Sequence, residues 1–361
     1  MAVSTISATG LDSTVSQIGK NILINGSHEV AQRSAAVTGM GAASGYTQVD
    51  MWHIIASGTA GRVTGSQVAG PLAATGHAKA VKIDVTTADS SVASGDIMSL
   101  RTSVEAQNLQ QLQWGVATAK SVTVSFWMKS PKAGTHCVSI YQEDDGRFFI
   151  REFTIASADT YEYFAITFPG DTGGTIDTNN GAGIRIDWPL ICGSGEAGSA
   201  GAWTSGGKFA TSNQQNLLDN TANNVELAGV QLELGTVATD FEHEPISVTL
   251  AKCQRYFWQQ AFPNDKYIAT AYIVSTTVST GPYAFPVTMR AVPTGGVFGT
   301  TLFELDHAGT ETQSSNMTFA GNTESTGALV MTVSSGLTAG QAGVIQGGTA
   351  GNAGLTASAE L

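Results

Sequence analysis

The sequence predicts a mainly β protein: an antiparallel jelly-roll or β-sandwich domain and a smaller C-terminal β-sandwich, joined by one short α-helix. Short apolar alternations separated by turn residues recur along almost the whole chain. Glycine supplies 42 of the 361 residues, and only 13% of the residues are charged. An average protein has about 7% glycine and about 25% charged residues. Many turns and few charged helix faces are typical of antiparallel sandwiches.

The pattern divides the chain into four parts. Residues 1–20 are small and polar, and a docking arm with one short helix and a loose terminus both fit them. Residues 21–246 form the predicted jelly-roll domain, 247–260 the linking helix and 261–361 the second sandwich.

The strand signals of the first domain are regular. In KSVTVSFWMKS the apolar residues alternate, which predicts a strand with one buried face. AKAVKIDVTT alternates in the same way, and THCVSIYQEDDGRFFIREFTI reads as a hairpin that turns at Asp145-Gly146. The long glycine-rich segment after Cys192 is expected to be held down by its aromatics, Trp203 and Phe209.

One strand changes parity. Val225 and Leu227 point one way, whereas Val230, Leu232 and Leu234 have the opposite parity. A strand keeps both sets in the core only if it slips by one residue. We therefore predict a bulge near Ala228-Gly229, since glycine suits such a position.

A helix is expected immediately afterwards. Pro245 and Ser247 mark its start, and Leu250, Cys253 and Phe257 then share one face. About three turns are marginal alone, so the helix is expected to act as a clasp at the junction of the two sandwiches. Short strand patterns follow, and the final LTASAEL reads as an edge strand.

Composition disfavours several classes of function. The net charge is −12 and no Lys/Arg block occurs, so no nucleic-acid partner is expected. No apolar run approaches about 18 residues, so no membrane insertion is expected, and the N-terminus lacks the pattern of a secretory signal. The three cysteines and six histidines show no metal-ligand spacing, so no metal or other cofactor is expected.

Acidic residues raise two further questions. The Glu143-Asp144-Asp145 turn suits a charged hairpin tip, and a Ca²⁺ ion at this turn stays an open alternative. Asp144, Asp145, Glu152 and Glu162 are candidate acids for glycan hydrolysis. No repeat of β-helical rungs is visible, and the protein is expected not to be an enzyme. His243, between two glutamates, is expected to cap the helix region.

Four aromatic residues in or beside glycine-rich loops are the candidate ligand-binding residues, because a loop aromatic can stack on a sugar ring. They are Trp188, Trp203, Phe209 and Tyr283.

Seven segments, in order, resemble a widespread family of bacteriophage fibre and tail proteins. They are NILINGSHEVAQRS, GYTQVDMWHI, KSVTVSFWMKS, VELAGVQLELGTVATDFEHEPI, LAKCQRYFWQ, FPVTMRAVPT and GLTAGQAGVIQ with LTASAEL. The resemblance covers about Asn21 to Leu361. It implies a carbohydrate-binding-like jelly roll, a clasp helix and a distal sandwich, in a virion protein that is usually a trimer. Long fibres carry a larger N-terminal anchor, so a short fibre mounted on the tail or the capsid fits as well.

These observations favour a structural virion protein that displays β-sandwiches for adhesion to host-surface glycans, with the N-terminal arm on other virion proteins. A decoration protein without a ligand and a polysaccharide depolymerase are the alternatives.

Overall fold

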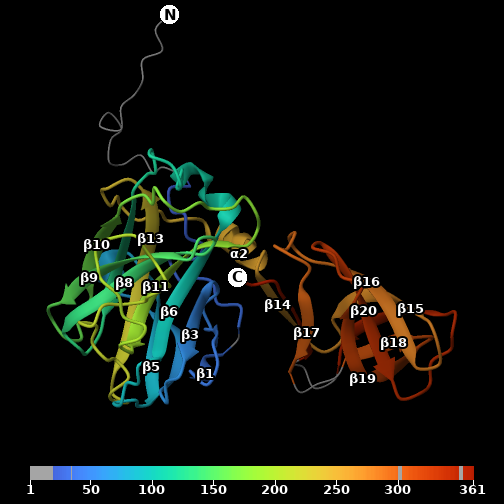
Figure 1. Ribbon diagram of the computed structural model, residues 1–361. Helices are drawn as coiled ribbons and strands as arrows, with labels where there is room; N and C mark the ends of the chain where they lie inside the picture. Colours follow the sequence, from blue (N-terminus) through green and yellow to red (C-terminus); the bar gives the residue numbers. More distant parts are fainter. Residues whose placement is uncertain (1–18, 34, 300–302, 349–352) are drawn as a thin grey trace, which may run out of the picture. The chain divides into compact units, whose positions relative to one another are not determined.

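The computed structural model describes residues 19–33, 35–299, 303–348 and 353–361, so the predicted helix of the N-terminal arm lies outside the described residues. The chain forms two compact units, which Figure 1 shows in blue to yellow and in orange to red. Both units consist of antiparallel strands, which confirms the predicted fold class. Two short segments, Val30–Ala35 and Gln48–Met51, group with the second unit, a feature that the strand pattern did not indicate.

The first unit is a sandwich of two sheets. The six-stranded sheet has the order β1 (Val37–Met40), β4 (Arg62–Ala69), β5 (Lys79–Thr87), β13 (Asn224–Leu234), β7 (Val122–Lys129) and β10 (Glu162–Phe168). The seven-stranded sheet has the order β12 (Thr204–Ser205), β9 (Arg147–Ile155), β8 (Gly134–Gln142), β11 (Ala182–Cys192), β6 (Ile97–Glu105), β3 (Trp52–Ser57) and β2 (Gly45–Tyr46). Two short helices, α1 (Leu72–Thr75) and η2 (Ala106–Leu112), connect strands.

The core lies between these sheets and is rich in aromatic rings. Phe126 of β7 and Trp188 of β11 come from opposite sheets, and their ring centroids are 5.6 Å apart. Trp52 of β3 packs against the same tryptophan at 5.5 Å. The predicted inner faces of two strands are confirmed, each residue being at most 5% exposed: Val81, Ile83 and Val85 on β5, and Val122, Val124, Phe126 and Met128 on β7.

The predicted bulge in β13 is confirmed. The register against β7 shifts between Ala228 and Gln231, and Gly229 has a φ of 56°. As a result Leu227 and Leu232, which have opposite parity, are both fully buried. Leu234, at the end of the strand, is 39% exposed and does not join them.

The bulge also marks a change of strand partner. Before it, β13 pairs with β5 over Asn224–Leu227. After the bulge, the same edge of β13 forms backbone hydrogen bonds with the segment 22–26. Ile22 N donates to Leu232 O (2.8 Å), and Val230 N donates to Gly26 O (2.9 Å). The predicted hairpin is confirmed as well, because β8 and β9 pair up to Gln142 and Arg147, around the turn that holds Asp145 and Gly146.

The second unit, for which the sequence predicted a smaller β-sandwich, contains a closed antiparallel barrel and a small sheet. The barrel order is β15 (Tyr267–Ile273), β16 (Val278–Ala284), β20 (Thr326–Val333), β19 (Thr310–Ala320), β18 (Phe303–His307) and β21 (Ala342–Gly347). The small sheet has the order β14 (Phe257–Phe262), β22 (Ala353–Ser358) and β17 (Thr294–Phe298). The last strand is therefore central and not an edge strand, because β14 and β17 both pair with it.

The linking helix is shorter than predicted. α2 spans Ile246–Gln254, whereas the prediction extended it to residue 260. Cys253 is fully buried as expected, but Phe257 starts β14 and pairs with Ser358. The helical spacing of Phe257 is overridden by this pairing with a strand about 100 residues away, which a local pattern cannot detect. The role of α2 as a clasp stays a prediction.

All three cysteines are free, and Cys137 and Cys253 are buried. Among the described residues, the helices are too short or too polar to cross a membrane.

Candidate functional site

The outer face of the seven-stranded sheet carries charged and aromatic side chains. On β11, strict alternation sends Ile184, Ile186 and Trp188 into the core and leaves Arg185 and Asp187 on the outer face. Trp188 was predicted to bind a ligand; it is 1% exposed, so that prediction is wrong. Its large ring packs in the core. Alternation along β11 decides the face to which the side chain points, and the neighbouring glycine-rich loop does not change it.

A buried ion pair lies at the centre of this face. Arg101 of β6 is directly opposite Asp187, and its Nε and Nη2 atoms donate to the two carboxylate oxygens at 2.9 Å each. Both side chains are at most 7% exposed. A bidentate pair of this kind has fixed geometry, so it holds the Arg101 guanidinium in one orientation.

The next row holds a second arginine and a tyrosine. Arg185 is opposite Tyr141 of β8, with the guanidinium carbon 5.9 Å from the phenol ring centroid. Its Nη2 donates to Glu143 Oε1 at 2.6 Å. Burial and the nearby Arg101 lower the pKa of Arg185 below its ordinary value, but arginine remains charged at neutral pH.

The glycine-rich loop between β11 and β13 folds over the same face. Phe209 N donates to Glu196 O, and the Phe209 ring centroid is 5.8 Å from the Arg101 guanidinium carbon. Trp203 packs against the rings of Trp114 (5.0 Å) and Phe149 (5.4 Å), and its Nε1 donates to Pro169 O. Both aromatics therefore hold the loop in place, as predicted.

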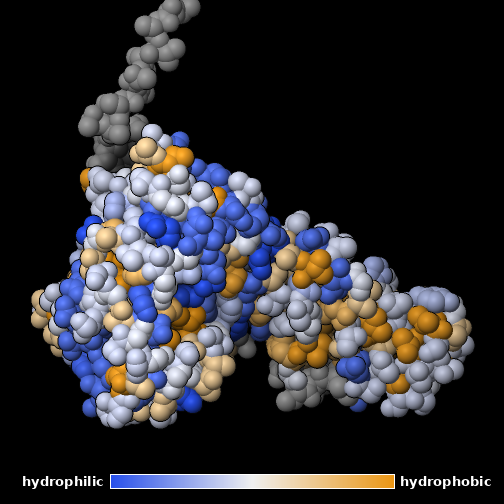
Figure 2. Space-filling view, in the orientation of Figure 1, coloured by the Kyte–Doolittle hydropathy of each residue, from blue (hydrophilic) through white to orange (hydrophobic). Residues whose placement is uncertain are grey.

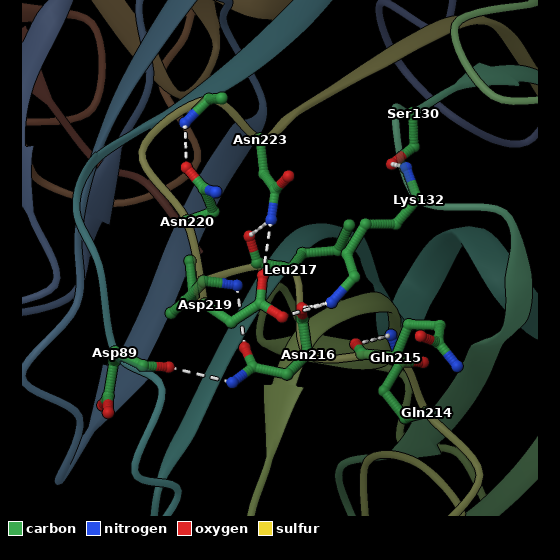
Figure 3. Close-up of polar contacts among 12 residues, drawn as sticks. Asp89, Ser130, Lys132, Gln214, Gln215, Asn216, Leu217, Asp219, Asn220 and Asn223 are labelled. Carbon is green, nitrogen blue, oxygen red and sulfur yellow. Dashed lines mark hydrogen bonds and ion pairs between the residues drawn. The ribbon is translucent and has the colours of Figure 1, made fainter.

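The last part of this loop is fixed by polar contacts, which Figure 3 shows. Lys132 Nζ donates to Asn216 O at 2.7 Å and also pairs with Asp219. Asn216 Nδ2 donates to Asp89 O, and Asn223 Nδ2 donates to Leu217 O and to Asp219 Oδ1. Side-chain amides here form the hydrogen bonds that backbone groups of a paired strand would form. These bonds fix the conformation of a long loop.

Between the loop and the sheet lies a pocket of about 350 Å³, within the size range of ligand sites. We call it the cationic pocket. Its chemistry-bearing lining residues are Arg101, Tyr141, Arg185, Asp187, Lys208 and Phe209. The lining holds three positive side chains and one carboxylate, and Glu143 pairs with Arg185 beside it, which leaves an excess of one positive charge in a protein whose net charge is −12. In Figure 2, strongly hydrophilic residues are interspersed with small hydrophobic patches over the first unit.

The four predicted ligand-binding residues do not converge. Only Phe209 lines the cationic pocket, while Trp203 packs against Trp114 and Phe149 and is not one of the lining residues. Tyr283 belongs to the second unit, where it packs against the core of that unit and burial raises its pKa to about 12. Arg101, Arg185 and Asp187 were not among the predicted ligand-binding residues. The sequence does show charged residues at alternate positions of apolar strands, a pattern that marks an outer sheet face.

The candidate acids for hydrolysis have structural partners. Glu152 accepts from Asn213 and Thr211, and Glu162 accepts from the backbone of Ala156 and Ser157. Asp145 accepts two hydrogen bonds from Thr175, and Asp144 accepts one from Asp177 N. Together with the Glu143–Arg185 pair, these contacts explain the acidic turn as a pinned hairpin tip.

A separate group of three carboxylates, Asp265, Glu304 and Glu311, lies in the second unit, with ligand atoms within 4.8 Å of one another. Such a group occurs in many proteins without an ion, and Glu311 already accepts a hydrogen bond from Gln346.

No family model matches this chain, and no curated protein matches its sequence. Solved structures with a similar course of strands include the family 11 carbohydrate-binding module from Clostridium thermocellum in complex with a β-1,3-1,4-mixed-linked tetrasaccharide. It is 16% identical, with 54% of this chain and 91% of that chain covered and a TM-score of 0.29. A putative sugar binding protein from Bacteroides thetaiotaomicron is 15% identical over 59% of this chain and 99% of that chain, with a TM-score of 0.31.

The enzymatically active domain of tailspike protein 4 from bacteriophage CBA120 is also similar. It is 11% identical, with 60% of this chain and 21% of that chain covered and a TM-score of 0.28. These values are too low to carry a function from those proteins to this chain.

Proposed function

We propose that the jelly-roll unit binds an acidic polysaccharide of a host cell surface through the cationic pocket. The observation that carries the proposal is the group of three positive side chains and two aromatic rings in a preformed pocket of an otherwise acidic protein. A carboxylate or sulfate of a sugar would accept hydrogen bonds from these cations, and the apolar face of the sugar ring would stack on Phe209 or Tyr141.

The geometry gives Arg101 and Lys208 different roles in the cationic pocket. Asp187 occupies Nε and Nη2 of Arg101, which leaves the Nη1 group of this fixed guanidinium to reach a ligand. Lys208 projects from the loop, where its Nζ also contacts Gly195 O. Because the sheet and the tied loop hold these groups in place before binding, little ordering is lost when a sugar arrives.

The place of the protein in a virion is the second part of the proposal. It is supported by the seven segments that resemble phage fibre and tail proteins. A short fibre on the tail or capsid, assembled as a homotrimer, would present several weak glycan sites at once and gain affinity by avidity. Mass measurement of the purified protein and antibody labelling of purified particles test the assembly and the location.

Titration calorimetry tests binding. The probes are polysialate, polygalacturonate and, as a neutral polymer, dextran. We expect at least one acidic probe to bind, with affinity falling as salt rises, and Lys208→Gln to weaken that binding about tenfold. The matched control is Lys120→Gln, which removes an exposed positive charge outside the pocket. Absence of binding to every acidic probe, or an equal loss in the control variant, contradicts the proposal and favours a decoration protein without a ligand.

A further inference from the structure

A second pocket lies on the outer face of the six-stranded sheet, on the side of the sandwich opposite to the cationic pocket. Its volume is about 520 Å³, again within the range of ligand sites. We call it the aromatic pocket and define it by His77, Trp127, Tyr163, Asp240, Phe241 and His243. It belongs wholly to the first unit.

The floor of the aromatic pocket is a cross-strand pair of rings. Tyr163 of β10 is directly opposite Trp127 of β7, and their ring centroids are 5.2 Å apart. Tyr163 is 46% exposed and lies near the start of β10, the edge strand of this sheet. An exposed aromatic pair on a rigid sheet offers flat surfaces on which a sugar ring can stack.

The wall of the pocket is the segment after β13, and two buried side chains fix it. Glu233 accepts hydrogen bonds from Thr239 N (2.9 Å), Thr239 Oγ1 (2.7 Å) and Gln231 Nε2 (2.8 Å). Gln231 Oε1 accepts from Glu242 N at 2.8 Å. Gln231 is fully buried and Glu233 is 4% exposed. These bonds hold Asp240 and Phe241 beside the sheet before any ligand binds.

The remaining side of the pocket is a stack of rings that rests on the bulge of β13. The His77 ring meets Phe241 edge-on at 4.8 Å and stacks on His243 at 5.7 Å. A Cβ at Gly229 would be 2.2 Å from His77 Nε2, so only glycine leaves room for the ring. His77 is 4% exposed, and its Nδ1 has no hydrogen-bond partner among the described residues.

The chemistry of the lining indicates the ligand. Asp240 is the charged side chain of the lining apart from the histidines, and burial, followed by the neighbouring His243, lowers the pKa of His77 to about 4, so His77 is neutral at physiological pH. Beside Asp240, Lys20 Nζ donates to Thr239 Oγ1 (2.9 Å) and to Asp240 O, so one negative and one positive charge lie at this wall and the pocket favours neither an anion nor a cation. The aromatic rings favour the C–H face of a sugar, while the Asp240 carboxylate and the His77 ring nitrogen suit its hydroxyl groups.

We infer that the aromatic pocket is a second glycan site, which takes a neutral sugar stacked on Tyr163 and Trp127 with its hydroxyls on Asp240 and His77. This inference does not depend on the cationic pocket. The two sites lie on the outer faces of opposite sheets and differ in charge.

Calorimetry with neutral tetrasaccharides of glucose, galactose and mannose tests the inference on the whole chain. We expect at least one of them to bind, Tyr163→Ala to weaken that binding at least tenfold and Asp240→Asn to weaken it several-fold. Both residues are exposed, so both variants are expected to fold. The matched control is Tyr267→Ala, which removes a 70% exposed tyrosine from the second unit and is expected to change nothing.

Two further readouts assign the site. Bound sugar is expected to protect exposed His243 from carbethoxylation, as measured by mass spectrometry of peptides. Lys208→Gln is expected to leave the neutral probe unaffected, so failure of one site is distinguished from failure of the other. The inference is overturned if no neutral probe binds at millimolar concentration, or if binding survives both substitutions. It is also overturned if the protein binds choline chloride in place of the neutral sugars and Tyr163→Ala abolishes that binding. The pocket would then hold a cation by cation–π contacts.

Discussion

At the scale of single residues, the Arg101–Asp187 pair joins stability to the proposed binding. Both charges are buried, and each satisfies the other. Removal of one partner leaves a buried charge without compensation, whereas replacement of both by apolar residues of similar size often costs little.

We therefore predict that Asp187→Ala lowers the free energy of unfolding of the jelly-roll unit by about 3–5 kcal/mol. The double variant Arg101→Met with Asp187→Leu is expected to recover most of this loss while acidic polysaccharide binding stays weak. Denaturant unfolding and calorimetry measure the two effects separately. A double variant as unstable as the single one would show that the pair is needed for packing and not only for charge balance.

At the scale of elements, the bulge of β13 performs two tasks. It keeps apolar residues of opposite parity in the core, and it opens the space that the His77 ring occupies. The parity change was visible in the sequence, but the ring on the other side of the backbone was not, because His77 lies about 150 residues away along the chain.

Gly229→Ala is predicted to destabilise the jelly-roll unit by about 2–5 kcal/mol, since an L-residue at positive φ costs about 1–2 kcal/mol and overpacking adds about 1–3 kcal/mol. The matched control is Gly39→Ala, at a φ of 70° with nothing within 4 Å of its Cβ, which isolates the backbone part. The difference in stability loss between Gly229→Ala and Gly39→Ala measures the clash with the His77 ring. Adding His77→Ala to Gly229→Ala is expected to remove this difference in thermal unfolding. If the difference remains, the His77 ring is not its cause.

At the scale of the whole molecule, the second unit contains a buried group whose charge changes near neutral pH. Arg33 pairs with both Glu360 (2.7 Å) and Asp50 (3.5 Å), so two carboxylates share one guanidinium. Burial raises the pKa of Asp50 to about 6 and that of Glu360 to about 7, although Arg33 opposes the shift.

The folded unit thus binds protons that the unfolded chain has already released, so its stability falls as pH rises. We predict that these two carboxyls stabilise the second unit fully below about pH 4 and that this contribution is lost between about pH 4 and 7. Denaturant unfolding at pH 5 and pH 8 measures the difference. Glu360→Gln is expected to flatten this slope, whereas Glu324→Gln, at an exposed acid of the same unit, is expected to leave it unchanged. A slope that Glu360→Gln does not alter would assign the effect to other groups.

The sequence alone determined the fold class, the inner faces of β5 and β7, the β8–β9 hairpin and the bulge at Gly229. All of these follow from side-chain alternation and turn chemistry, which act between neighbours in the chain. Only the tertiary structure decided which strands meet. It placed Phe257 in a strand, made the last strand central, buried Trp188, and brought Arg101, Asp187 and Phe209 into one pocket. Pairing between strands that are distant in the sequence sets these positions. The alternation of side chains within one strand does not specify which strand pairs with it.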